Sequence, residues 1–439
     1  MTRPIWLLAA AALVFAGTAA VAQSPLQLAV SEAAFDNGLD LAVDDLDPRA
    51  GAIAYGRAQH GGRVGAGAIP VDWAIRPAPY DAAAAFGAAQ AAGRELAWVQ
   101  EQAPSDPRYH ALVRGLARYR ALAALGGWSP LALGPPLRLG AAGANVVALR
   151  QRLALEDPRV EASAEIYDDD LMNAVIRAQT RYGLTADGVA GPKTIGALNV
   201  PTAQRVDQIL ANMERWRWML RALPARRIEV NTAAATLTVF WDGRVAAAVR
   251  IIPGKPKTPT PMFIDSVSGV TFNPPWNVPK KIADEEIWPN IRRNRNYMRE
   301  QGFVVMPNGA LRQSPGPRAA LGAFKFEMGN PFGVYLHDTP NRGLFAWDWR
   351  LLSHGCMRVE NPRLLADILL DGDAVWTKAT IDAALETGVT IKAPLKQPFP
   401  LFVAHWTAFA DADGQMNFRG DDYGWDASLM ALLAKSGNR

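Results

Sequence analysis

The spacing of apolar residues changes once along this chain, near residue 226. Before that point, apolar residues recur every three or four positions, as on one face of a helix. The clearest example is Asp169–Tyr182, with apolar residues at Leu171, Ala174, Val175, Ala178 and Tyr182. After residue 226 the period is two, as in strands with one buried face. The pattern therefore predicts a multidomain α+β chain, helical in its first half and mostly β in its second.

The helical half divides at proline and glycine residues. Short helices and loops are predicted for residues 23–79, and an alanine-rich helix for Tyr80–Gln102. The segment Pro104–Pro107 separates that helix from a second amphipathic helix, which ends near Gly126. We expect these segments to form a helical scaffold domain over residues 23–136.

Two further helical segments follow the scaffold. Residues 137–200 have the pattern of three short helices, with a glycine-rich loop before the last one. A longer helix is predicted to begin at Thr202, a suitable N-cap, and to end before Pro224. We therefore expect a small three-helix module, either a binding unit or a simple spacer, and a connector helix over residues 201–225.

The β-rich half contains many short strands with turn signals between them. The sequence "WDG", residues 241–243, separates two alternating segments and predicts a tight hairpin. Further strands are predicted for residues 268–272, 302–306, 324–326, 333–337, 389–392 and 401–409. Such a series is typical of a β-sandwich or barrel, which we assign to residues 226–433. A polar helical stretch interrupts it, and we expect a capping insertion there, at about residues 280–320, that acts as a lid.

Charge narrows the possible partners. The chain has 439 residues, with 46 Lys and Arg against 42 Asp and Glu, and its sequence pI is about 9.2. The basic residues form no long block. This mild positive charge gives no support for a nucleic-acid partner.

The first residues predict export. A positive residue precedes an apolar run from Ile5 to Phe15, and small residues at Ala20 and Ala22 mark a cleavage site. The run is shorter than the ~20 residues that span a bilayer. We expect a signal peptide over residues 1–22 and a periplasmic location, with an uncleaved anchor at the inner membrane as the alternative.

Cys356 is the only cysteine in the chain. In an exported protein, a single cysteine is a buried inert thiol, an intermolecular link or a reactive group. His354 lies two residues before it, and His337 ends a predicted strand farther upstream. If the intervening segment returns the chain to the sheet, His337 can take the proton of Cys356. Gly355 permits a tight turn whose N–H groups can face an acyl oxyanion.

These motifs resemble those of a known family. The sequence "HDTP" from His337, followed by "SHGCMRVENP" from Ser353, resembles the catalytic signature of the L,D-transpeptidases, which cross-link peptidoglycan. The stretches "GKPKTPTP", "FNPPWNVP", "IADEEIWP" and "PGPRAALGAFKF" resemble the large Gram-negative branch of that family. In the helical half, "VVALRQRL", "AVIRAQTRYGL" and "DGVAGPKTIGALN" resemble the three-helix peptidoglycan-binding module of cell-wall enzymes.

The resemblance implies a role for each residue of the signature. Cys356 would be the nucleophile, and His337 the general base and later the acid. The carbonyl of Asp338 would orient the imidazole, and His354 and Gly355 would shape the oxyanion hole together with Cys356. The implied substrate-binding residues are Arg358, Tyr335, Trp276 and Ser353.

The implied reaction joins two peptidoglycan stem peptides. The thiolate attacks the L-centre carbonyl of the third residue of a tetrapeptide stem, D-Ala leaves, and an amine of a second stem resolves the thioester as a 3→3 cross-link. Arg358 would pair bidentately with a carboxylate of the donor stem, the alternative being a surface salt bridge. No cofactor or metal is implied, because Cys356, His354 and His337 lack a clear fourth ligand.

Other interpretations of these residues stay open. Resolution by water would make the chain an L,D-carboxypeptidase or cross-link hydrolase, and an inactive site would leave a wall-binding protein. The expected partners are donor and acceptor stem peptides, proteins of wall synthesis, and carbapenems as covalent inhibitors. Trp347 and Trp349 can stack on glycan, but core packing is the expectation in a chain with 14 tryptophans.

Overall fold

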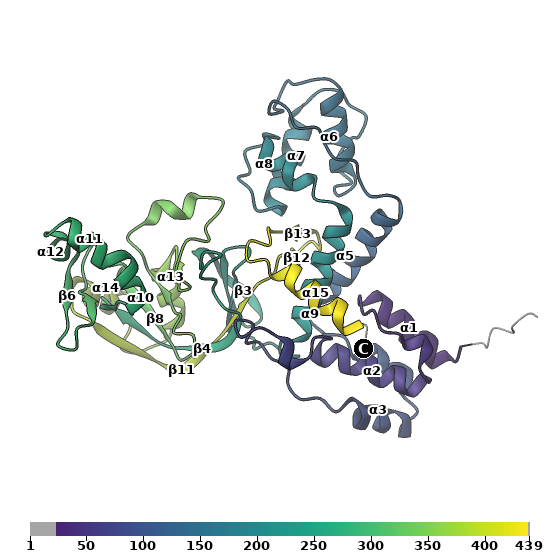
Figure 1. The fold of residues 1–439 in the computed structure, drawn as a ribbon, viewed down its shortest axis with the longest axis horizontal. Coiled ribbons are helices and arrows are strands. Elements are labelled where there is room, and N and C mark those ends of the chain that lie inside the picture. The colour runs from purple at the N-terminus through teal and green to yellow at the C-terminus, as the bar shows by residue number, and fades with distance from the viewer. Residues whose placement is uncertain (1–22, 438–439) are drawn as a thin grey trace, which may run out of the picture.

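The structure is a computed structural model that describes residues 23–437. The predicted signal peptide, residues 1–22, lies outside the described residues. Figure 1 shows a helical scaffold with a small helical module above it and a β-rich domain at the left. None of the described helices has the length and apolar character needed to cross a membrane.

Aspartate and proline mark the starts of scaffold helices. α2 (Pro48–Gly61) and α5 (Pro107–Ala124) each begin with proline after an aspartate whose carboxylate accepts backbone N–H groups. The other elements of this part are α1 (Pro25–Asp36), η1 (Val43–Asp45), η2 (Ala66–Ala68), α3 (Ala82–Ala91) and α4 (Glu95–Glu101). The prediction of one helix over Tyr80–Gln102 is wrong, because Gly93, with φ of +63°, separates α3 from α4.

The projecting module consists of α6 (Ala144–Ala154), α7 (Asp169–Arg181) and α8 (Pro192–Leu198). The predicted apolar stripe of α7 faces inward and is buried. The side chain of the buried Gln179 donates hydrogen bonds to Asp187, Thr194 and the Val189 carbonyl. This amide therefore fixes the glycine-rich loop that leads into α8.

The central helix of the scaffold is α9 (Thr202–Arg217), which packs against α2 and α5. The C-terminal elements β12 (Ala408–Ala410) and α15 (Trp425–Gly437) also contact it. Figure 1 accordingly shows the yellow C-terminal helix α15 next to α9, in the helical part of the molecule. Apolar residues of this tail complete the scaffold core, among them Trp406, Phe418 and Leu429. The tail after residue 404 thus packs with the scaffold, whereas its sequence predicts a place in the β-rich domain over residues 226–433.

Within residues 23–437, eight strands close into a barrel in the order β1-β11-β4-β8-β9-β10-β3-β2. Most pairs are antiparallel, but β1–β11 and β9–β10 are parallel. The strands are β1 (Arg227–Asn231), β2 (Thr236–Trp241), β3 (Arg244–Ile252), β4 (Phe263–Phe272), β8 (Phe324–Met328), β9 (Leu336–His337), β10 (Met357–Val359) and β11 (Ile391–Ala404). Helices α13 (Pro362–Leu369) and α14 (Lys378–Glu386) pack on the barrel core. The predicted multidomain α+β class and mostly-β domain are confirmed.

Two sequence predictions about the strands have different outcomes. The "WDG" hairpin is confirmed, since Asp242 and Gly243 both have positive φ, of 49° and 75°, between β2 and β3. The strands predicted at 389–392 and 401–409 are present with different bounds, because residues 391–404 form the single strand β11 and residues 408–410 form β12. Prolines are uncommon inside strands, and a bulge between Pro394 and Phe399 lets β11 continue past them.

The capping insertion has its own core, formed by Val278, Ala283, Ile287, Phe303 and Leu311. It contains a small sheet in the order β5-β7-β6, of strands β5 (Trp276–Asn277), β6 (Phe303–Val305) and β7 (Leu311–Gln313). Its helices are α10 (Lys280–Ile282), the π-helical η3 (Ala283–Ile287), α11 (Trp288–Arg293) and α12 (Tyr297–Gln301). The insertion is thus a separate small unit on the barrel, with strands as well as the predicted helices.

Candidate active site

Strands β9 and β10 bring the predicted catalytic residues to one face of the barrel. They are parallel neighbours, with His337 directly opposite Arg358. Because side chains alternate along a strand, Tyr335 and His337 share a face with Cys356 and Arg358. The intervening residue of each strand points the other way, into the barrel core. The sheet therefore sets these four side chains side by side, outside the apolar interior.

His337 is held as a neutral base. Its Nδ1 lies 2.5 Å from the carbonyl oxygen of Asp338. A carbonyl can only accept, so Nδ1 carries the proton and Nε2 keeps a free electron pair. Burial lowers the pKa of His337 to about 3, and the charge of Arg358 contributes to the shift. The imidazole is therefore uncharged at neutral pH and can take a proton at Nε2.

The Asp338 carboxylate fixes the strand end that carries this base. It accepts the backbone N–H of Ala323 at 2.8 Å and of Thr339 at 2.6 Å, and it pairs with Arg342. The carbonyl of Asp338 thus meets the imidazole, while its side chain ties the strand end to the neighbouring loops.

A compact network of hydrogen bonds shapes the turn before Cys356. Gly355 has φ of +117°, a conformation that favours glycine. Ser353 Oγ accepts the Gly355 N–H at 3.0 Å and donates to the Cys356 carbonyl. Ser353 is 2% exposed, so this predicted substrate-binding residue lies inside the turn. The Gly355 N–H is engaged there, and the predicted oxyanion hole is not preformed at that group.

Cys356 is a free, half-buried cysteine whose side chain lies beside Tyr335. Burial raises the pKa of Cys356, although Tyr335 and the positive charges of Lys325 and Arg358 act in the opposite direction. Burial also raises the pKa of Tyr335. The resting site therefore holds a neutral thiol beside a neutral imidazole.

Arg358 and Lys325 make this face of the site positive. Lys325, on β8, lies opposite His337 on β9 and pairs with Glu327 at 2.7 Å. Arg358 has no salt-bridge partner among residues 23–437, so the alternative of a structural surface ion pair finds no support. Burial lowers the pKa of Arg358, a cost that an anionic ligand would offset. The guanidinium is therefore available to bind a carboxylate.

The capping insertion contacts the site through two of the predicted residues. Trp276, on β5, lies close to the Tyr335 side chain. His354 does not point toward the thiol, because its Nε2 lies 2.7 Å from Glu286 Oε1 on η3 and 3.3 Å from Lys255 Nζ. Its side chain therefore connects the turn to the insertion, and any part in an oxyanion hole falls to its backbone.

Cys356 and His337 lie on the same face of the barrel but are not hydrogen-bonded to each other. No hydrogen bond between them is present in the described part of the chain. They are diagonal neighbours on adjacent strands, about 8 Å apart at Cα from the strand spacing and rise. Such pairs commonly tighten only when substrate binds. The site can thus form a covalent acyl-enzyme, with His337 taking the thiol proton.

A cavity of about 410 Å³ lies next to Asp338, the residue after the base His337. Its walls include Asp338, Thr339, Arg342 and Glu386. Cys356 and Tyr335 do not line it, so it is distinct from the face that carries the thiol. Among the described residues, no group of three or more His, Cys, Asp or Glu side chains can hold a metal ion.

The sequence did not reveal the residues that support the turn before Cys356, called here the nucleophile turn. Thr260 Oγ1 donates to the Gly355 carbonyl at 2.7 Å and accepts the Gly254 N–H. Tyr423 Oη donates to the Gly254 carbonyl at 2.6 Å. Gly254 is tightly enclosed, since an added Cβ would lie 2.1 Å from the Thr258 carbonyl oxygen. The motif "GKPKTPTP" was a signal for this loop, but nothing in the sequence placed it against the tail.

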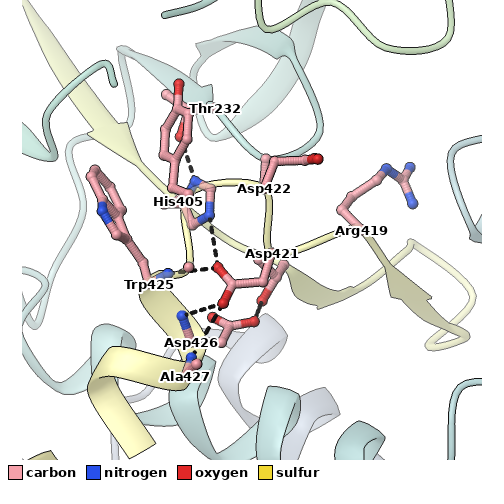
Figure 2. A network of polar contacts seen from close by, with 12 residues as sticks. Thr232, His405, Arg419, Asp421, Asp422, Trp425, Asp426 and Ala427 are labelled. Carbon is pink, nitrogen blue, oxygen red and sulfur yellow. Dashed lines mark hydrogen bonds and ion pairs between the residues drawn. The ribbon is translucent and has the colours of Figure 1, made fainter. Parts of the chain in front are cut away.

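Tyr423 lies beside the network of polar contacts that Figure 2 shows around His405 and Asp421. Its ring stacks on His405, whose Nδ1 lies 2.8 Å from Thr232 Oγ1. Asp421 accepts the N–H groups of Trp425 and Asp426 at the start of α15. This network links the nucleophile turn, through Tyr423, to the scaffold.

Comparisons with known proteins agree with this geometry. Residues 225–377 match the family model described as "L,D-transpeptidase catalytic domain", and residues 142–198 match "Putative peptidoglycan binding domain". Residues 225–377 are thus similar to L,D-transpeptidase catalytic domains. A curated relative from Haemophilus influenzae, named "Putative L,D-transpeptidase", is 33% identical over 255 residues, which are 52% of this chain and 51% of the relative. The chain thus spans about half the length of that relative.

Solved L,D-transpeptidase structures are more distant. One from Xylanimonas cellulosilytica is 18% identical, with 63% of this chain and 100% of that chain covered and a TM-score of 0.23. Another, L,D-transpeptidase 3 from Mycobacterium tuberculosis with a faropenem-derived adduct, is 15% identical, with 42% and 61% covered and a TM-score of 0.22. The family assignment of the domain rests on the sequence matches.

Proposed function

We propose that this chain is a peptidoglycan L,D-transpeptidase that forms 3→3 cross-links through a thioester on Cys356. The observation that carries the proposal is the face shared by β9 and β10. It places the half-buried Cys356 on the same face as a neutral histidine and a guanidinium without a salt-bridge partner in the described chain. The match to an L,D-transpeptidase catalytic domain supports the proposal.

Acylation begins with proton transfer. His337 Nε2 takes the thiol proton as Cys356 Sγ attacks the L-centre carbonyl of the third residue of a tetrapeptide stem. Backbone N–H groups of the turn other than that of Gly355 stabilise the oxyanion. As the tetrahedral intermediate collapses, the imidazolium gives its proton to the departing amine of D-Ala. The bond to D-Ala is then broken and a thioester to Cys356 is formed.

Transfer repeats the same steps with a second stem. An amine of the acceptor attacks the thioester, His337 takes a proton from that amine, and Cys356 leaves as thiolate and is reprotonated. The order is ping-pong, with one nucleophile serving two substrates in turn. The neutral resting pair suits both steps, because His337 starts each one as a base.

Arg358 and Tyr335 position the donor in this proposal. A free carboxylate of the donor stem would form the ion pair with Arg358, and bidentate pairing would fix the orientation of the peptide. Tyr335 lies against Cys356, and Trp276 contacts Tyr335 from the capping insertion. The insertion then forms one wall of the donor site.

Location and inhibition belong to the same proposal. Peptidoglycan cross-links form outside the cytoplasmic membrane, so the enzyme acts in the periplasm. Carbapenems would acylate Cys356, since they present a strained carbonyl to the same thiol, and proteins of wall synthesis are further partners. Fractionation that recovers the full-length protein only from the cytoplasm would contradict the proposed location.

Product analysis with defined muropeptides tests the proposal. The purified protein is incubated with disaccharide-tetrapeptides, and the products are separated and identified by mass spectrometry. Release of D-Ala together with a 3→3 dimer is expected, and Cys356→Ala should give neither product. Release of D-Ala without dimer would instead establish the L,D-carboxypeptidase, and no reaction at all would leave a wall-binding protein.

A further inference from the structure

Two tryptophans near the site are exposed where core packing was expected. Trp347 is 55% exposed and Trp349 is 45% exposed. Every other tryptophan within residues 23–437 is buried or half-buried. The expectation that these two pack in the core is therefore wrong. Exposed pairs of large aromatic side chains commonly mark binding surfaces.

The segment that carries these tryptophans is firmly held. Arg350 Nη1 donates to the Trp347 carbonyl at 2.7 Å, while its Nη2 reaches the Ala235 carbonyl beside β2 at 3.3 Å. Trp349 Nε1 donates to Asp422 Oδ1 at 3.1 Å. The backbone at Trp347 and the indole ring of Trp349 are thus held in place, which lowers the entropy that a ligand must remove on binding.

Asp348, between the two tryptophans, ties the segment to the peptidoglycan-binding module. Its carboxylate accepts a hydrogen bond from Thr185 and pairs with Lys193 Nζ at 3.3 Å. Thr185 and Lys193 both lie within the matched residues 142–198. The surface around the tryptophans is therefore continuous with the module.

The same segment also leads to the catalytic residues. It connects β9, which ends at His337, with the turn before Cys356. A polymer that contacts the module and this segment together would be held beside the site. Along the chain, the tryptophan pair therefore lies between the base His337 and the nucleophile Cys356.

We infer that Trp347 and Trp349 form a saccharide-binding surface that holds the glycan strand of peptidoglycan. Indole rings stack on the C–H faces of sugar rings without needing a charge on the ligand. A glycan strand fits better than a stem peptide, because the charged groups that suit a peptide lie on the β9–β10 face. The continuity with the module selects the same polymer as ligand.

This inference rests on the proposed function and adds that the enzyme distinguishes polymer from soluble substrate. The test compares wild type with the double variant Trp347→Ala/Trp349→Ala on intact sacculi and on soluble disaccharide-tetrapeptide. We expect a loss of at least 10-fold in 3→3 cross-linking of sacculi, and a change below twofold on the soluble substrate. Trp347→Phe/Trp349→Phe keeps the stacking surface and should recover most of the loss.

The control is Phe35→Ala, which removes an aromatic side chain that is 64% exposed on α1. It should leave activity on both substrates unchanged. If wild type acts on neither substrate, the proposed function fails. If wild type is active and the double variant keeps its activity on purified sacculi, this inference alone is overturned. The same holds if the double variant loses cross-linking only in cells, because that result would assign the surface to a protein partner.

Discussion

At the scale of single residues, the site depends on charge states that neighbours impose. His337 is buried and donates Nδ1–H to a carbonyl, so it remains neutral. Burial likewise raises the pKa of Cys356 and keeps the thiol protonated. These residues therefore do not form a resting thiolate–imidazolium pair. The proton moves only during attack on the substrate, which makes the pH dependence of the enzyme diagnostic.

Alkylation of Cys356 by iodoacetamide should accelerate only at alkaline pH. Because burial raises the pKa of this thiol, the midpoint should lie above the ~8.5 of a free cysteine. Acylation by a carbapenem should persist as pH falls from 7 to 5, since the pKa of His337 is about 3 and its imidazole stays neutral over that range. Both rates are measured by intact mass spectrometry.

A thiol midpoint near pH 6 would show a resting ion pair and contradict this account. Arg358→Gln provides a directional check. Removing this positive charge should raise the pKa of His337 and of Cys356 alike, since Arg358 lowers both. The alkylation midpoint should therefore shift further upward.

At the scale of elements, two contacts position the nucleophile turn. One is the loop 254–260, which Tyr423 holds from the tail. The other is the contact of His354 with Glu286, which joins the turn to the capping insertion. The Tyr423 contact is mostly buried and the His354–Glu286 contact is exposed, so they contribute differently to the free energy of the fold.

Tyr423→Phe should slow catalysis without unfolding the protein. The variant loses the bond to the Gly254 carbonyl, worth about 1–2 kcal/mol, and loosens the loop that holds Gly355. We expect kcat to fall about 10-fold with KM changed less than twofold. Tyr80→Phe is the matched control, because it removes a hydroxyl that donates to Gln102 at 2.8 Å in the scaffold. Equal kinetics for the two variants would remove Tyr423 from any positioning role.

Glu286→Ala should increase the mobility of the capping insertion. An exposed pair of this kind contributes about 0.5–1 kcal/mol, which corresponds to a two- to fivefold change in an opening equilibrium. Hydrogen exchange of residues 280–301 should accelerate by that factor. Asp284→Ala, which breaks the Lys280–Asp284 pair inside the insertion, is the control and should leave exchange of residues 285–301 unchanged. Unchanged exchange in Glu286→Ala would show that the contact does not restrain the insertion.

At the scale of the whole molecule, α9 joins parts of the chain that lie far apart in sequence. Glu214 Oε1 accepts the Arg63 N–H at 2.6 Å, and its other oxygen pairs with Arg217 at 2.9 Å. Arg215 pairs with Asp426 on α15 at 2.5 Å. These charges are almost completely buried, so each depends on its partner.

Glu214→Ala should therefore destabilise the entire scaffold. It leaves the Arg217 guanidinium buried and without its carboxylate, at a cost of about 3–5 kcal/mol in the free energy of unfolding. Chemical denaturation followed by tryptophan fluorescence measures the change. Glu101→Ala removes a pair with Arg94 in which both side chains are more than half exposed, and should cost less than about 1 kcal/mol. Similar losses for the two variants would contradict the role given to α9.

The sequence predicted local structure better than contacts between distant segments. The period of apolar residues located α7 and α9, and "WDG" located the β2–β3 hairpin, because these signals are local. The motif around Cys356 identified the candidate nucleophile and base. The packing of the tail on α9, the support from Tyr423 and the exposure of Trp347 depend on which distant segments meet, and no local pattern specifies that.

Mapping the covalent intermediate tests the central claim most directly. The protein is incubated with a carbapenem, digested and examined by peptide mass spectrometry, with Cys356→Ala treated in parallel. The account predicts one adduct, on the peptide containing Cys356, and none in the variant. An adduct on another residue, or one that survives Cys356→Ala, would contradict the assignment of Cys356 as nucleophile.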